Sequence, residues 1–259
     1  VFIQGNDGGS GITALRFDMS SAGAAAFNST ITGTSFNGIP FYSADTSSIY
    51  TTDVSGTDDT AANNTAFGYQ AYDAVTTADE GTAVGSGALG ATTTGAKNTG
   101  VGYAALATNT TGSDNIAVGV ASLYANTTGA KNIAIGKSAA AANTTGTRNI
   151  TIGWEAYNNS DTENDNIAIG YNAMTTNTAG GQANVAVGNY ALDALTSGDL
   201  NVAVGYDALS TTSTGVNNVA VGSYALTANT TGASNNAVGY NALGANTTGT
   251  ENTAMGHRA

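Results

Sequence analysis

The chain has 259 residues and a formal net charge of −12, and only 9% of its residues are charged. Its six lysines and arginines form no basic patch that could neutralise phosphates, so nucleic acid and anionic membrane surfaces are poor partners. The hydrophobic share of 41% is too high for a disordered chain, and the lack of cysteine excludes disulfides and thiolate metal sites.

Residues 1–59 follow no repeat and are interpreted as an irregular β-rich connector. Thr13, Leu15, Phe17 and Met19 alternate with other residues in "ITALRFDM", which predicts a strand with one apolar face. The chain begins with valine, so we expect a piece of a longer polypeptide whose connector joins the rest to something upstream. No apolar run approaches the ~20 residues of a membrane span, and no membrane insertion is expected.

Residues 60–259 form a repeat array that stops partway through a unit, at "AMGHRA". Each 17-residue unit has an apolar triplet ending at a glycine, and this glycine recurs at a constant interval except for one step that is longer by a single position. The marker glycines are Gly68, Gly85, Gly102, Gly119, Gly136, Gly153, Gly170, Gly188, Gly205, Gly222, Gly239 and Gly256. A unit this short has room for two short strands and two turns. We therefore predict an all-β parallel β-solenoid (β-roll) of about twelve coils stacked at ~4.8 Å.

Stacking in register places each residue against its own copy one coil away. Like charges at ~4 Å repel by ~1 kcal/mol even in water, so the columns are expected to be neutral. Asparagine can donate and accept at once, and glycine permits the positive φ of a corner. The structural ladder is expected to include Asn98, Asn115, Asn132, Asn149, Asn166, Gly119, Gly136 and Gly153.

Both faces of the predicted strand are apolar. In "NIAIG" (132–136), Ile133 and Ile135 point to one face, and Ala134 and Gly136 point to the other. A thin coil buries only one face in its own interior, so the other needs a cover as long as the stack. We predict that this cover is a second copy of the chain, in a cyclic homo-oligomer.

The repeat resembles the head domains of trimeric autotransporter adhesins (YadA-like heads), which are left-handed parallel β-rolls with a "NxVAIG" motif that pack three to a shaft. The similar segments are "NIAIG", "NVAVG" (184–188 and 201–205) and "NNAVG" (235–239), and the likeness covers residues 60–259. The family's unit is usually shorter than the unit of this chain.

Longer units such as "NTAFGYQAY" (64–72) look more like repeats of bacteriophage tail fibres, and "ALRFDMSSAGAAAFNSTITG" (14–33) resembles connectors of those fibres. Both likenesses imply a parallel homotrimer that serves as a surface-exposed attachment protein, with no enzymatic activity and no cofactor. The phage likeness implies an extracellular place in the virion. It also implies upstream fibre or baseplate proteins and a host receptor, glycans included, as partners.

Few residues suggest chemistry. His257 is the only histidine, and no cysteine or activated serine accompanies it, so no catalytic residue is assigned. Asp161, Glu163 and Asp165 cluster in one turn and are weak candidates for a Ca²⁺ site against the reading of a solvated turn. Aromatic residues after the marker glycines could stack on sugars, although shielding of the coil edge and of the groove between chains is favoured. They are Tyr69, Tyr103, Trp154, Tyr171, Tyr206 and Tyr240.

Two alternatives to a phage fibre stay open. The first is a trimeric adhesin on a bacterial cell surface, which has the same architecture. The second, less favoured, is an ice-binding solenoid, suggested by columns of threonine. Ice binding calls for threonines two apart on a flat face, whereas Thr127 and Thr128 are neighbours in a turn.

Overall fold

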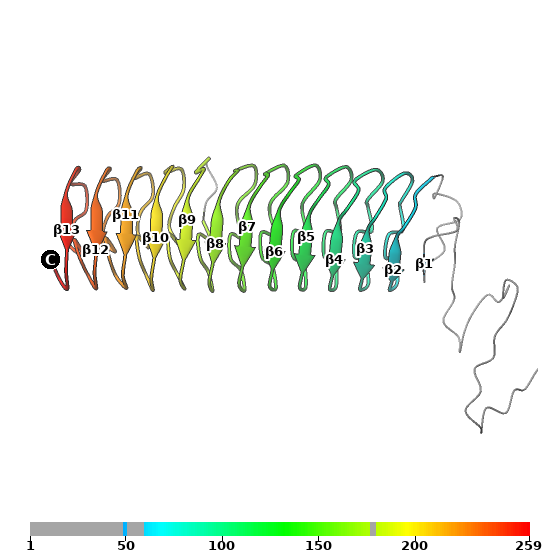
Figure 1. Ribbon diagram of the computed structural model, residues 1–259, viewed down its shortest axis with the longest axis horizontal. Coiled ribbons are helices and arrows are strands. Elements are labelled where there is room, and N and C mark those ends of the chain that lie inside the picture. The colour runs from blue at the N-terminus through cyan, green and yellow to red at the C-terminus, as the bar shows by residue number, and fades with distance from the viewer. Residues whose placement is uncertain (1–48, 51–59, 177–179) are drawn as a thin grey trace, which may run out of the picture. The chain divides into compact units, whose positions relative to one another are not determined.

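The computed structural model describes residues 49–50, 60–176 and 180–259. Within these ranges there is no helix, and 13 strands form one parallel sheet in chain order. The strands are β1 (Ile49–Tyr50), β2 (Thr65–Phe67), β3 (Thr82–Val84), β4 (Thr99–Val101), β5 (Ile116–Val118), β6 (Ile133–Ile135), β7 (Ile150–Ile152), β8 (Ile167–Ile169), β9 (Val185–Val187), β10 (Val202–Val204), β11 (Val219–Val221), β12 (Asn236–Val238) and β13 (Thr253–Met255). Figure 1 shows β2 to β13 side by side, with each coil lying on the next.

The strand register confirms the predicted parallel β-solenoid. Ala117 of β5 pairs with Ala134 of β6, which is its counterpart in the next unit. The interval from β8 to β9 is longer by a single position, and Ala168 still pairs with Ala186. The apolar triplets therefore stack triplet on triplet across the whole described repeat, including the irregular step.

The interior of the coil is lined by the middle residue of each triplet, which is alanine except at Gly100 of β4 and Thr151 of β7. Ala134 is fully buried, whereas Ile135 beside it is 39% exposed. A second buried column lies four residues after the marker glycine and is mostly leucine, as at Leu123. Alanine faces inward because the interior holds only a small side chain on the strand side once the leucine column fills the opposite side.

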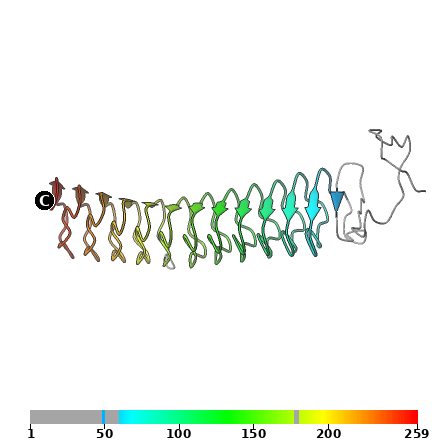
Figure 2. The same cartoon turned by 90° about the horizontal axis from the view of Figure 1, so that it is seen from below.

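One strand per coil, not two, is formed, which corrects the prediction from the repeat length. After each strand the chain returns through turns, seen opposite the arrows in Figure 2. In the coil of β6, Ser138 and Ala140 have φ of 55° and 49°. Residues that alternate into the left-handed region cannot continue a strand. The returning segment is held to the next coil by backbone bonds instead, such as the 3.0 Å bond from the Leu123 N–H to the Ala139 carbonyl.

The marker glycines stand at the corner where each strand ends. Gly119, Gly136 and Gly153 have φ between +132° and +141°, a conformation open to glycine alone. A Cβ on Gly136 would lie 2.4 Å from the carbonyl oxygen of Gly153. Glycine is therefore required here twice, by the backbone angle and by the next coil.

The connector assigned to residues 1–59 lies outside the described residues, except for β1. Ile49 and Tyr50 pair in parallel with Thr65 and Ala66 of β2, so the parallel pairing reaches into that segment. Among the residues that the structure describes, none belongs to a helix able to cross a membrane.

Candidate functional site

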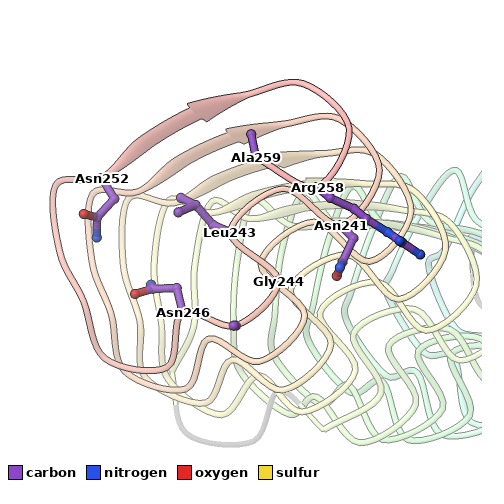
Figure 3. Close-up of a pocket in the computed structure, with 8 residues that line it drawn as sticks. Asn241, Leu243, Gly244, Asn246, Asn252, Arg258 and Ala259 are labelled. Atoms are coloured by element: carbon purple, nitrogen blue, oxygen red, sulfur yellow. The ribbon is translucent and has the colours of Figure 1, made fainter.

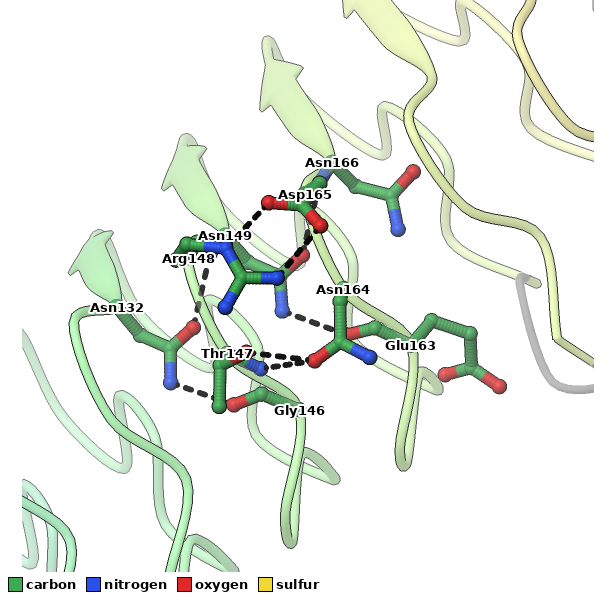
Figure 4. Close-up of polar contacts among 9 residues, drawn as sticks. All are labelled: Asn132, Gly146, Thr147, Arg148, Asn149, Glu163, Asn164, Asp165 and Asn166. Carbon is green, nitrogen blue, oxygen red and sulfur yellow. Dashed lines mark hydrogen bonds and ion pairs between the residues drawn. The ribbon is translucent and has the colours of Figure 1, made fainter.

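The asparagine four residues before the marker glycine, replaced only once, by Gly81, is buried in every coil but the last. Asn132 donates from Nδ2 to the Gly146 carbonyl at 2.8 Å, and its Oδ1 accepts the Asn149 N–H at 2.9 Å (Figure 4). The same two bonds recur from coil to coil. Their acceptor atoms on the column are Oδ1 of Asn98, Asn115, Asn132, Asn149, Asn166, Asn184, Asn201, Asn218 and Asn235. The ladder thus links side chain to backbone across coils, and its amides are committed to the fold.

One column departs from the expectation that columns are neutral. The residue five before the marker glycine is exposed and charged through six coils, at Glu80, Lys97, Asp114, Lys131, Arg148 and Asp165. The signs mostly alternate along the stack, so most neighbours attract. Arg148 and Asp165 form a two-point ion pair, with Nε to Oδ1 at 2.6 Å and Nη2 to Oδ2 at 2.7 Å. Like charges repel only where neighbouring residues of a column are identical in sign, so a column of mostly alternating charges is also compatible with stacking.

The ion pair in Figure 4 also shifts the titration of both groups. Hydrogen bonding to the Arg148 guanidinium lowers the pKa of the Asp165 carboxyl, and the carboxylate raises the pKa of the guanidinium in turn. Both side chains are exposed to solvent, so the pair makes a small contribution to stability that salt weakens further.

The three acidic residues proposed as a Ca²⁺ site have separate partners. The Glu163 carboxylate is buried and accepts the backbone N–H groups of Asp161 at 2.9 Å, Thr162 at 3.1 Å and Gly180 at 3.1 Å. Asp165 points to Arg148 instead, away from the Glu163 carboxylate in Figure 4. Asp161 accepts the hydroxyl of Thr144. In the described part of the chain no three such side chains come together as a metal-binding group.

Glu163 stands in the turn where most coils have glycine. Its three backbone donors make the side chain part of the turn itself, a role the sequence alone does not reveal because the donors come from two coils. The cluster is therefore a turn-stabilising carboxylate beside a surface ion pair.

The outward face of the sheet carries the first and third residues of the triplets in two columns. The third residue is apolar in every strand from β2 to β13, and the first is apolar from β5 to β11. Among them Ile116, Val118, Ile135, Val204 and Val221 are 36–40% exposed. Phe67 and Met255, the third residues of β2 and β13, are 52% and 73% exposed. We call these two columns the outer apolar face. Through its third-residue column it runs from β2 to β13, which is unusual for a monomeric soluble surface.

Aromatic side chains gather beside this face. The six aromatic residues singled out after the marker glycines are all exposed, from 42% for Tyr171 to 74% for Tyr69. His257 lies in the same column and stacks on Tyr240, with ring centroids 5.2 Å apart. It has no acidic or nucleophilic partner that would suit it for catalysis among the contacts described.

A hollow of about 410 Å³ lies at the last coil and is lined by Leu243, Asn246, Asn252 and Arg258, among others (Figure 3). Leu243 belongs to the leucine column of the interior, and Asn252 to the asparagine ladder. The hollow is thus the end view of the ordinary coil interior rather than a separate site.

Comparison of the chain with family models, with curated proteins and with solved structures found no match. The surface features of the solenoid are therefore the basis for any functional assignment.

Proposed function

We propose that the chain is a structural and attachment protein, the trimeric shaft or head of a bacteriophage tail fibre that positions or provides binding to a host-surface receptor. The observation that carries this proposal is the outer apolar face, continuous from β2 to β13. A face of that length is matched by an identical face on a parallel copy, because both have the same coil spacing. Three copies around one axis cover all three faces in a closed assembly.

The coil stack supports a mechanical role. Each coil is joined to the next by strand pairing, by the asparagine ladder and by backbone bonds in the returning turns. Stability then grows by addition of nearest-neighbour interfaces, as in other repeat proteins. Such a stack supplies length and stiffness and calls for no chemistry of its own.

Sedimentation velocity and native mass spectrometry of the full chain test the assembly. We expect a species of three times the 25.5 kDa chain mass. Ile135→Glu, in the outer apolar face, should shift the assembly towards monomer, because the substitution would bury unpaired charges at the interface between chains. Thr128→Glu, in an exposed turn column, is the matched control and should leave the mass unchanged. A wild-type monomer at micromolar concentration would refute the trimer.

Binding of the fluorescently labelled chain to cells tests attachment. A phage fibre should adhere to a subset of bacterial strains, whereas an adhesin of a bacterial surface should adhere to animal cells or matrix. Adhesion to neither would contradict both versions of the attachment role.

One observation bears on ice binding. Thr77, Thr94, Thr111, Thr128 and Thr145 form an exposed column. The neighbouring threonine column is less available, since the Thr127 hydroxyl donates to the Thr144 carbonyl at 3.1 Å. A thermal hysteresis assay decides this alternative, and the committed hydroxyls lead us to expect no ice shaping.

A further inference from the structure

Six aromatic rings form a continuous ladder over the last six strands, β8 to β13. The rings are those of Tyr171, Tyr190, Tyr206, Tyr224, Tyr240 and His257, which we call the tyrosine ladder. Neighbouring tyrosine rings meet edge to face, with centroids 5.5–5.9 Å apart. One ring per coil gives the ladder the same repeat as the stack.

The five tyrosines of the ladder alternate between two sequence positions, and His257 takes the same position as Tyr240. Tyr171, Tyr206 and Tyr240 directly follow the marker glycine and are 42–43% exposed. Tyr190 and Tyr224 occupy the next position and are half-buried. The more exposed tyrosine rings therefore recur every second coil, about 9.6 Å apart at the usual strand spacing. Edge-to-face contact with the half-buried rings fixes their orientation.

Polar groups flank the exposed rings. Asn189, exposed in the coil between Tyr171 and Tyr206, accepts the Tyr171 N–H at 2.9 Å through its Oδ1. The Asp207 carboxylate follows Tyr206 directly in the chain, and the Arg258 guanidinium lies 6.0 Å from the ring centre of Tyr240. Each exposed ring thus has a hydrogen-bonding side chain near it.

We propose that the tyrosine ladder binds a linear, neutral glycan laid along the coil stack. Sugar rings have apolar C–H faces that pack on aromatic rings, and hydroxyl edges that form hydrogen bonds with polar side chains. The ladder offers both, since polar side chains flank its exposed rings. The two-coil spacing of the exposed rings is comparable to the length of one disaccharide in an extended β-linked chain. The net charge of −12 disfavours an anionic polymer, whether acidic glycan or nucleic acid.

The proposal deepens the attachment role and rests on it, because it names the surface and the ligand class through which the host would be recognised. It also departs from the interpretation favoured by the sequence, in which these aromatic residues only shield the coil edge. The reason is that the rings are preorganised against each other and still exposed.

Isothermal titration calorimetry of the full chain tests the ladder, with cellohexaose and chitohexaose as neutral probes and oligogalacturonate as the acidic one. We expect both or one of the neutral hexaoses to bind and the acidic probe to bind at least tenfold more weakly. Tyr206→Ala should weaken neutral binding about tenfold, and Tyr206→Phe, which keeps the ring face, should retain most of it. Tyr103→Ala, an exposed ring outside the ladder, is the matched control.

Circular dichroism melting of each variant separates binding from folding. A Tyr206→Ala variant with unchanged melting and weakened binding supports the proposal. If wild type binds neither neutral probe up to millimolar concentration, or if Tyr103→Ala weakens binding as much as Tyr206→Ala, the ladder is not the site. If chemical cross-linking of the assembled chains joins two copies through the tyrosine ladder, a second copy occupies the ladder and the proposal fails. Cell adhesion that persists in Tyr206→Ala would refute the role of the ladder and leave the attachment role standing. Hexaose binding without cell adhesion would refute the attachment role.

Discussion

Replacing Gly136 by alanine should be among the most damaging single-methyl changes in this chain. The residue has φ of +132°, and an added Cβ would lie 2.4 Å from the Gly153 carbonyl oxygen and 2.7 Å from its carbon. Both are backbone atoms, so no side chain can move aside. The next coil must shift instead, or the corner must change its dihedral angles.

The magnitude follows from two contributions. Holding a residue with a Cβ in this glycine-only region costs about 1–3 kcal/mol. Separating the coils weakens the bonds that the two corners make, from Gly136 N–H to the Val118 carbonyl and from Gly153 N–H to the Ile135 carbonyl, both 2.8 Å. Each such bond contributes about 0.5–1.5 kcal/mol. We expect Gly136→Ala to lower the free energy of unfolding by about 2–6 kcal/mol.

Urea denaturation followed by circular dichroism measures the loss, and Gly87→Ala is the matched control. Gly87 has φ of +69°, and the atom nearest to its added Cβ would be 4.0 Å away. Alanine already occupies the same column at Ala104 and Ala121, with φ of 55° and 56°. The control should cost about 1 kcal/mol. Equal losses in the two variants would refute the reasoning from the corner geometry.

Three further outcomes are expected. Asn132→Ala leaves the buried Asn149 N–H without its side-chain acceptor, and leaves the Gly146 carbonyl only the longer bond of 3.3 Å from Asn143 Nδ2. It should cost about 2–4 kcal/mol in the same urea assay, and a loss under about 1 kcal/mol would contradict the ladder. The Asp165 carboxyl, whose pKa is lowered by Arg148, should titrate by NMR at higher pH in Arg148→Ala. Because the pKa of Asp165 is lower in the folded chain, the ion pair stabilises the fold fully at pH values above the ordinary carboxyl pKa of 3.8, and this stabilisation is lost as the pH falls through the folded pKa. An unchanged titration of Asp165 in Arg148→Ala would show that the pair does not form in solution. The Asp207 charge raises the pKa of the Tyr206 phenol, so Asp207→Asn should lower that pKa in an ultraviolet absorbance titration, and no change would place the two groups further apart.

The fold was predictable because the repeat restricts every column at once. The constant period, the alternation in triplets such as Ile133–Ile135 and the neutral asparagines all indicate stacked coils, and strand pairing agrees with them. The glycine corners were predictable for the same reason, since a Cβ at Gly136 has no space against Gly153 of the next coil.

The rest was hidden because it depends on backbone angles and on partners in the next coil. Ser138 and Ala140 carry no sequence mark of a left-handed conformation, so the length of the unit predicts a second strand where the structure has the returning segment. Glu163 looked like a possible metal ligand beside Asp161 and Asp165 because spacing along the chain does not show where each carboxylate points. The tyrosine ladder was hidden by its alternation between two positions, which breaks any single-column pattern.

The step between β8 and β9 has a consequence for how such a chain changes length over generations. The longer interval there leaves Ala168 opposite Ala186, so an extra residue is absorbed without disturbing the strands on either side. Gene segments that encode whole units can then be duplicated or lost by recombination, even at imperfect junctions. Each such event changes the reach of the protein by one strand spacing, about 4.8 Å, and preserves the strand pairing on either side.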